Sequence, residues 1–154
     1  YYEGTFKNNK KDGNGKLYKK NIKYIGFFKN DLFDEMGELY YDNYYYKGYF
    51  KLGLKNGNGK LYLNNILLYE GQFLNDSKDG KGILYNIKTS NIIYNGNFVN
   101  DTRDGYGILY FDNGLICYKG NWSHNMTNDY GEEYDKDKNL IYKGQWKYNE
   151  KINN

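Results

Sequence analysis

The chain has 154 residues, of which 20% are aromatic and 27% are charged, and it contains no proline. No apolar run approaches the roughly 20 residues that a membrane-spanning helix needs, and the single cysteine, Cys117, excludes an internal disulfide. The composition favours β structure and a reducing compartment. We therefore expect a cytoplasmic location. This expectation includes the cytoplasmic face of a membrane and the cytoskeleton.

One pattern recurs along the chain, a tyrosine followed two residues later by glycine and two residues after that by phenylalanine or tryptophan. It begins at residues 2, 24, 46, 69, 94, 118 and 142. In the first six units a further glycine stands thirteen residues after the tyrosine. Such self-similarity predicts a single repeat array over residues 1–154, with six full units and a half unit. The start on a repeat tyrosine without methionine, and the incomplete seventh unit, indicate a piece of a longer protein.

The first unit predicts a β-hairpin. Along Tyr2–Lys7, aromatic or glycine residues alternate with polar ones, which is typical of a strand. Residues 8–13 are rich in turn-forming types, so we expect a long polar turn and a second strand over residues 14–18. Residues 19–23 would lead into the next unit.

The recurrent glycines are predicted to lie where an aromatic ring of the same or the next hairpin approaches the backbone. Replacing Gly82 or Gly107 with valine should therefore cost more stability than strand propensity alone implies.

Two units depart from the pattern. The second unit has Glu35 and the sixth has Asp129, where the other four full units have glycine. The sixth unit also has Glu133, where five others have leucine. An acid at that core position suggests a weak unit, a unit covered by a partner or an approach to the end of the array. The longer units place their extra residues in loops, at residues 88–91 and around residues 112–115.

The motif Tyr-Glu-Gly-x-Phe-x-Asn … Asp-Gly-x-Gly-x-Leu-Tyr resembles the membrane occupation and recognition nexus, or MORN, repeat over essentially the whole chain. The resemblance implies an all-β fold, an elongated single-layer solenoid of tandem antiparallel β-hairpins. It also implies scaffold roles at membrane–cytoskeleton junctions and an affinity for acidic phospholipids. Family members carry such repeats beside kinase, methyltransferase or exchange-factor domains, and no such domain is present here. Phenylalanine replaces the usual tryptophan in five units.

No catalytic constellation is apparent. His124 is the sole histidine, and a nucleophile would have to be Ser123 or Cys117 without the surrounding motif of a hydrolase. We interpret His124 as a solvated turn residue and Cys117 as a core residue, and we predict no enzyme activity and no cofactor.

A metal site is not indicated either. Asp135, Asp137 and Asn139 copy the first half of a calcium loop, but Leu140 replaces the glycine that this loop requires. One histidine and one cysteine are also too few for an internal structural zinc site.

Two aromatic rows remain for binding. The first is Phe6, Phe28, Phe50, Phe73, Phe98, Trp122 and Trp146, and the second is Tyr18, Tyr40, Tyr62, Tyr85, Tyr110 and Tyr134. The favoured interpretation of the first row is an internal spine. The alternative is that both rows line an open groove for an extended peptide or a helix of a partner protein.

A lysine cluster marks the first unit, namely Lys7, Lys10, Lys11, Lys16, Lys19, Lys20 and Lys23. It is compatible with a solvated face, with attraction to an anionic membrane surface and, least of all, with nucleic acid, since arginine is nearly absent. The sequence thus predicts a non-catalytic scaffold that binds adaptor or cytoskeletal proteins. The alternatives are a membrane-tethering lipid module and the regulatory array of a larger enzyme. Exposed terminal strands would also allow a homodimer.

Overall fold

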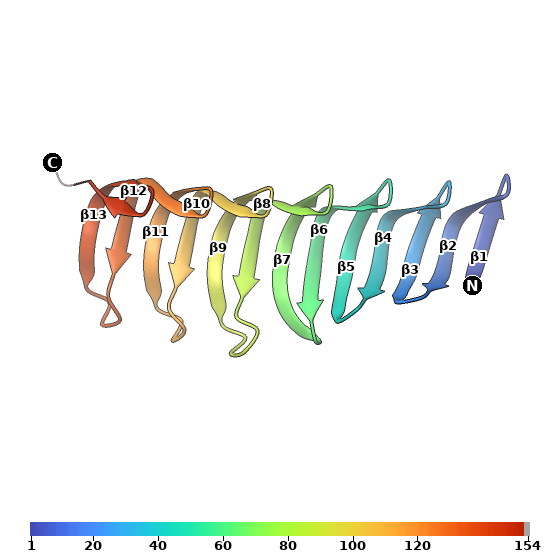
Figure 1. Cartoon of the computed structure of the whole chain (residues 1–154), viewed down its shortest axis with the longest axis horizontal. Coiled ribbons are helices and arrows are strands. Elements are labelled where there is room, and N and C mark those ends of the chain that lie inside the picture. The colour runs from blue at the N-terminus through green and yellow to red at the C-terminus, as the bar shows by residue number, and fades with distance from the viewer. Residues whose placement is uncertain (153–154) are drawn as a thin grey trace. The chain divides into compact units, whose positions relative to one another are not determined.

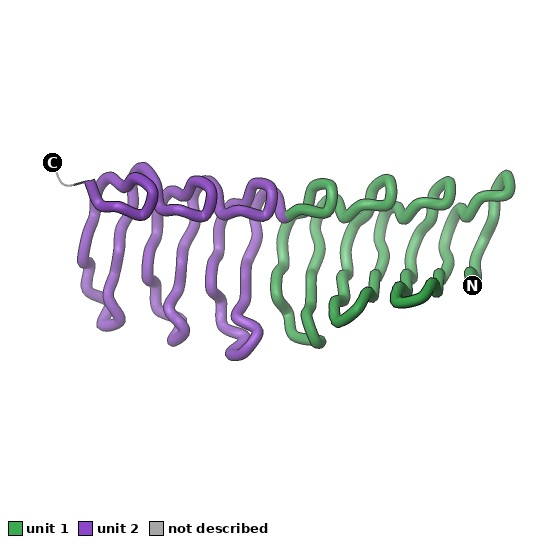
Figure 2. The backbone as a smooth tube through the Cα atoms, in the orientation of Figure 1, with its two compact units in different colours: residues 1–77 green, residues 78–154 purple. Residues whose placement is uncertain are grey.

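The computed structural model describes residues 1–152, which form fourteen β-strands (Figure 1). The chain divides into two compact units, residues 1–77 and 78–154 (Figure 2). The first unit contains β1 (Tyr2–Lys7), β2 (Lys10–Lys19), β3 (Ile22–Lys29), β4 (Leu32–Tyr41), β5 (Tyr44–Lys51), β6 (Leu54–Leu63) and β7 (Ile66–Leu74). The strands that follow are β8 (Ser77–Tyr85), β9 (Ile92–Val99), β10 (Thr102–Tyr110), β11 (Ile116–Ser123), β12 (Met126–Tyr134), β13 (Leu140–Lys147) and β14 (Glu150–Lys151).

Within each unit the strands are antiparallel and lie in the sheet in chain order. The predicted all-β class and the single layer of tandem hairpins are confirmed.

The predicted long turn is wrong, because each hairpin closes through two residues. In the first hairpin these are Asn8 and Asn9, with φ of 50° and 60°, and Lys7 already pairs with Lys10. Two left-handed residues make a type I′ turn, whose twist matches that of the flanking strands. Asparagine tolerates this conformation. The second strand therefore begins at Lys10, earlier than expected.

Each second strand bends shortly after the turn. The bend residue has a positive φ, 94° at Gly13 and 93° at Gly57, and the pairing register of the first hairpin shifts between Gly4 and Phe6. Glycine adopts this conformation without steric cost, which explains the extra glycine of four units. The bend brings the turn end of the hairpin over the tyrosine, so that Lys11 Nζ lies 5.6 Å from the centre of the Tyr2 ring.

Glu35 occupies the bend position of the second hairpin with φ of 52°, a region that costs a non-glycine residue about 1–2 kcal/mol. We expect Glu35→Gly to raise the free energy of unfolding, by up to about 1 kcal/mol after the added chain entropy of glycine is subtracted. Urea unfolding checks this. Asp129→Gly at the same position of the sixth hairpin, with φ of 58°, should gain less because aspartate tolerates the conformation better. A loss of stability in both variants would contradict the assigned role of the bend.

Five repeat tyrosines each cover a pair of glycines on adjacent strands: Tyr2, Tyr24, Tyr46, Tyr94 and Tyr118. Gly26 faces Gly37 across β3 and β4, and a Cβ added at Gly37 would lie 2.3 Å from the Tyr24 hydroxyl oxygen. The ring therefore lies directly on bare backbone. The Tyr24 hydroxyl donates a hydrogen bond to the Phe27 carbonyl at 3.0 Å, so the buried polar atom is satisfied. The predicted ring-over-glycine packing is present, within the same hairpin.

The phenylalanines and tryptophans join consecutive tyrosines into a spine. Phe50 meets Tyr24 and Tyr46 edge to face, with centroids 5.3 and 5.1 Å apart, and Trp122 meets Tyr94 and Tyr118 at 5.6 and 5.1 Å. Edge-to-face contact is a favoured arrangement of aromatic rings. The core of each unit is thus a line of rings on one face of the sheet, here called the core face; the opposite surface is the outer face.

A clamp fastens a tight turn to the preceding hairpin wherever the second turn residue is aspartate or asparagine and a hairpin precedes it; the third turn, with Gly53, keeps only the backbone bond to the Phe33 carbonyl. The Asp31 carboxylate accepts a hydrogen bond from the Lys11 amide at 2.9 Å, and the Asp31 amide donates to the Lys11 carbonyl at 3.0 Å. Asp76 with Lys55 and Asn125 with Arg103 repeat the arrangement. The second turn residue therefore has two tasks, tolerance of a positive φ and docking onto the preceding hairpin.

Candidate functional site

The two aromatic rows predicted to share a groove lie on opposite faces. Leu17 pairs with Tyr24 on the core face, and because neighbouring residues of a strand alternate, Tyr18 points to the outer face. The same alternation applies to the other five tyrosines of that row: Tyr40, Tyr62, Tyr85, Tyr110 and Tyr134. The expectation of one groove lined by both rows is therefore corrected.

The phenylalanine and tryptophan row is the internal spine. Its members Phe28, Phe50, Phe73, Phe98, Trp122 and Trp146 are only 0–6% exposed. Phe6 is 62% exposed, and within residues 1–152 the Tyr2 ring is its only aromatic neighbour. The buried side chains hold the hairpins together and are not available to a partner.

Tyrosines form a continuous row on the outer face of the first unit. Tyr40 stacks on Tyr45 at 4.6 Å, Tyr45 stacks on Tyr62 at 5.2 Å, and Lys23 lies between Tyr18 and Tyr40, its Nζ 5.9 and 4.9 Å from their ring centres. The row crosses β2 to β6, one side chain from each strand. Tyr45 was missed by the sequence analysis, because it precedes the repeat tyrosine of its unit and follows no glycine pattern.

An ion-paired row runs beside the tyrosines. Lys47 pairs with Glu38 at 2.9 Å and Lys60 with Glu70 at 2.9 Å in the first unit. In the second unit Glu132 pairs with Lys119 at 2.8 Å and with Lys143 at 3.0 Å, and it also accepts a hydrogen bond from the Tyr134 hydroxyl. These donors hold the pKa of Glu132 down, at about 2.

Glu132 makes the stability of the second compact unit, residues 78–154, depend on pH. Because its pKa in the folded state is depressed, its stabilising contribution is present above its ordinary value near 4.5 and is lost as the pH falls toward about 2. We expect the melting temperature to fall between pH 4.5 and 2.5, with a smaller fall in Glu132→Gln. Thermal unfolding followed by circular dichroism at a series of pH values measures this. Identical pH profiles for the two proteins would remove the role of Glu132.

The lysine cluster is not gathered into one patch. Lys7 and Lys10 flank the tight turn of the first hairpin, whereas Lys19 and Lys20 lie at the far end of β2. Lys16 is exposed on the outer face, and the remaining two are partly covered, Lys23 by the tyrosine row and Lys11 by its ion pair with Asp31 at 3.3 Å. Lys11 thus belongs to the turn clamp.

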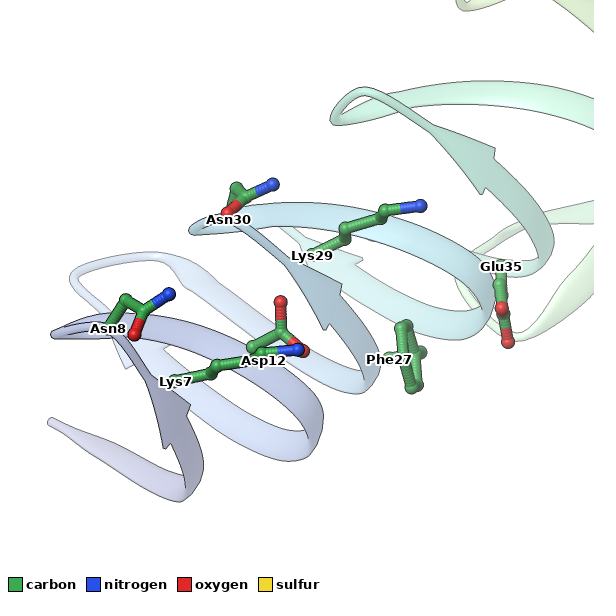
Figure 3. A pocket seen from close by; sticks show the side chains of 7 residues that line it. All are labelled: Lys7, Asn8, Asp12, Phe27, Lys29, Asn30 and Glu35. Atoms are coloured by element: carbon green, nitrogen blue, oxygen red, sulfur yellow. The ribbon is translucent and has the colours of Figure 1, made fainter.

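Two hollows lie between successive turn ends on the outer face of the first unit. The first has a volume of about 420 Å³ and is lined by Lys7, Asn8, Asp12, Phe27, Lys29, Asn30 and Glu35 (Figure 3). The second, of about 670 Å³, shares Lys29, Asn30 and Glu35 with the first. Both hollows lie beside a hairpin bend, since Glu35 lines both of them and Gly57 lines the second.

His124 has no catalytic geometry. It is the first residue of a type I′ turn, with φ of 48°, and its side chain is 80% exposed. Ser123 Oγ lies 3.0 Å from Nδ1, and Asp104 Oδ2 lies 3.9 Å from the same nitrogen. A catalytic triad needs serine and aspartate on different ring nitrogens.

The residues of the calcium-like loop bond to each other. The Asp135 carboxylate accepts hydrogen bonds from the amides of Asp137 and Asn139 at 2.9 and 2.8 Å, and from the Asn139 side chain at 3.0 Å. Within residues 1–152 no cluster of three or more histidine, cysteine, aspartate or glutamate side chains has the geometry to hold a metal ion.

Glu133, the acid at the leucine position, is neutralised within the chain. Its Oε2 lies 2.5 Å from Lys151 Nζ, and Lys151 in turn lies over the rings of Tyr142 and Trp146. Cys117 is half-buried, and burial, with a smaller effect of Glu133, raises the pKa of its thiol. In the last hairpin, formed by β13 and β14, Lys151 thus occupies the ring-covering position that Lys11 occupies in the first hairpin.

The repeated hairpins match a known family model, since the model of the MORN repeat matches residues 2–21, 24–44, 46–65, 69–86 and 94–116. The chain belongs to the MORN repeat family. Each matched segment begins on the tyrosine that opens a unit. The hairpins after residue 116 carry the same packing, since Tyr118 covers Gly120 and Gly131.

MORN repeats are generally modules for protein or membrane interaction and are typically non-catalytic. No curated protein matches the chain. In the described part of this MORN chain, no helix has the length and apolar character to cross a bilayer.

Proposed function

We propose that this MORN array is a non-catalytic scaffold whose outer face holds an extended segment of a partner protein, at the cytoplasmic face of a membrane or at the cytoskeleton. The observation that carries the proposal is the tyrosine row of β2 to β6. It crosses five strands on the face that the core leaves open. Tyrosines supply large contact area with little loss of rotamer freedom, and aromatic residues are enriched at interfaces.

Selection of a random peptide library on the purified chain tests the proposal. We expect enriched peptides to bind the wild-type chain and to lose at least tenfold in affinity for a variant with Tyr40→Ser and Tyr45→Ser. Both side chains lie on the outer face, half-buried, so the hairpin core remains intact. Lys88→Ser in the exposed loop after β8 is a matched surface control. Unchanged affinity in the double variant would contradict the proposal.

A membrane-tethering module is the second candidate. Lys7, Lys10, Lys16, Lys19 and Lys20 are exposed, and among the described residues none of them forms an ion pair. Lysines near an anionic bilayer contribute roughly 1 kcal/mol each. Co-sedimentation with phosphatidylserine vesicles at physiological salt, compared with neutral vesicles, tests this. Absence of binding would refute the membrane-tethering function, and binding that persists after Lys10, Lys19 and Lys20 become glutamine would refute the lysine assignment.

A further inference from the structure

A second row of side chains crosses the outer face of the second compact unit, residues 78–154. Its members are adjacent in sequence to glycines that the repeat tyrosines cover on the core face, such as Gly107 beneath Tyr94. Because side chains alternate along a strand, these members point to the outer face. The row, here called the amide–tyrosine row, takes one side chain from each of β9 to β13: Asn97, Tyr106, Asn121, Tyr130 and Gln145. Tyr106 is 52% exposed and Tyr130 is 46% exposed, so both rings are open to a partner.

The three amide side chains of the row are free to bind a partner. The backbone carbonyls of Asn97, Asn121 and Gln145 accept hydrogen bonds from the repeat tyrosines of their own hairpins, whereas their side-chain amides make no hydrogen bond among residues 1–152. Each side-chain amide offers two donors and one acceptor, and each phenol of the row adds a hydroxyl. A segment with free carbonyl groups would satisfy these donors.

The row carries no charge of its own. Lys81, which continues it on β8, and Asp129, which precedes Tyr130, border it with opposite charges. The Glu132 carboxylate nearby is already paired with two lysines. The row therefore selects neither an acidic nor a basic partner, and a neutral segment fits it best.

The spacing of the row decides the conformation of that segment. Adjacent strands lie about 4.8 Å apart, so Tyr106 on β10 and Tyr130 on β12 stand roughly 9.6 Å apart. A polyproline II helix repeats after three residues of about 3.1 Å each, so it presents the same face every ~9.3 Å. An extended β-segment repeats after two residues, about 6.7 Å, and would run out of step with the tyrosines. An α-helix keeps its carbonyls in internal hydrogen bonds, whereas polyproline II leaves every carbonyl free for the amides.

We propose that the amide–tyrosine row binds a proline-rich segment of a partner protein, which crosses the strands as a polyproline II helix. Proline rings three residues apart pack against Tyr106 and Tyr130, and Asn121 between them donates a hydrogen bond to a carbonyl of the segment. Aromatic-lined surfaces bind such segments well, because the ligand is ordered before it binds and loses little entropy. The inference goes beyond the proposed function, because it adds a binding row in the second compact unit and names the chemistry of the partner. It uses no side chain of the tyrosine row of the first unit.

The test uses a fluorescently labelled oligoproline of about ten residues, longer than the roughly six residues that span the row. Fluorescence anisotropy with the full chain should show saturable binding. Tyr106→Ser combined with Tyr130→Ser should lower the affinity at least tenfold, and Asn121→Ala should lower it severalfold. Tyr148→Asn is the matched control, because Tyr148 is 60% exposed in the tight turn after β13 and lies outside the row. Thermal unfolding verifies that each variant keeps the fold.

A glycine–serine peptide of the same length should bind at least tenfold more weakly, because it is a flexible coil. The inference is overturned if oligoproline does not bind, if the flexible peptide binds equally well, or if the Tyr106→Ser and Tyr130→Ser variant keeps full affinity. Binding of a cellulose oligosaccharide without binding of oligoproline would assign the row to carbohydrate instead.

The variants also separate this site from the tyrosine row. Loss of oligoproline binding with Tyr40→Ser and Tyr45→Ser, but not with Tyr106→Ser and Tyr130→Ser, would overturn the amide–tyrosine site and leave the scaffold function standing. Oligoproline binding that depends on Tyr106 and Tyr130, with no effect of Tyr40→Ser and Tyr45→Ser on the peptides selected from the library, would contradict the tyrosine row and support this inference.

Discussion

Replacing Gly107 with valine is expected to lower the free energy of unfolding by about 4 kcal/mol. A Cβ at this residue would lie 2.1 Å from the Tyr94 hydroxyl oxygen and 2.3 Å from the ring carbon that bears it. Tyr94 is 0% exposed and donates a hydrogen bond to the Asn97 carbonyl at 3.1 Å. The ring must move, which combines overpacking, about 3 kcal/mol, with loss of this hydrogen bond, about 1 kcal/mol.

Urea unfolding followed by far-ultraviolet circular dichroism measures the change. Gly114→Asn is the control, because no atom lies within 4 Å of a Cβ at Gly114 and asparagine tolerates its φ of 83°. The control should lose less than about 1 kcal/mol. A Gly107→Val protein as stable as the control would show that the tyrosine does not lie on the glycine pair.

The burial of Tyr94 has a second consequence. Burial raises the pKa of its hydroxyl to about 12. The hydroxyl therefore stays protonated, and can donate its hydrogen bond to the Asn97 carbonyl, up to a more alkaline pH than an exposed tyrosine would.

The sequence was sufficient to predict the repeat and the packing of rings on glycine. Both are local in register, since Tyr24, Gly26 and Gly37 belong to one hairpin and their spacing recurs in every full unit. Leucine at position 17 and tyrosine at position 18 are neighbours on one strand, so their opposite faces also follow from period-two alternation. The prediction of a single groove was wrong because the alternation was applied only to the first strand of each repeat. It was not applied to the second strand, which carries the tyrosines Tyr18 to Tyr134.

The bend and its consequences could not be read from the sequence. In the sequence, Gly13 cannot be told from a turn residue. Only the pairing of Lys7 with Lys10 shows that the turn ends before Gly13, so that its positive φ belongs to the bend. The clamp between Lys11 and Asp31 joins residues twenty apart. The residue types of the clamp recur along the chain, but which residue bonds to which follows only once the register of both turns is known.

Trp122→Ala should destabilise the second compact unit, residues 78–154, by about 4 kcal/mol, as expected when a large buried aromatic side chain is removed. Trp122 is 5% exposed, joins the rings of Tyr94 and Tyr118, and donates a hydrogen bond from Nε1 to the Gly107 carbonyl at 3.2 Å. It also covers the Arg103 guanidinium, whose carbon lies 4.3 Å from the ring centre and whose pKa burial lowers. Truncation leaves a cavity and a partly desolvated cation at once.

The Trp122→Phe variant keeps the ring contacts of the spine and removes the contacts that only tryptophan makes. Phenylalanine occupies this position in five hairpins and still contacts two tyrosines where both are present, as Phe50 does. The variant should lose only about 1 kcal/mol, chiefly through the absent Nε1 hydrogen bond. Urea unfolding monitored by the fluorescence of Trp146 measures both variants. Equal losses in the two would mean that Trp122 stabilises the unit through its indole N–H and Arg103 rather than through the line of rings.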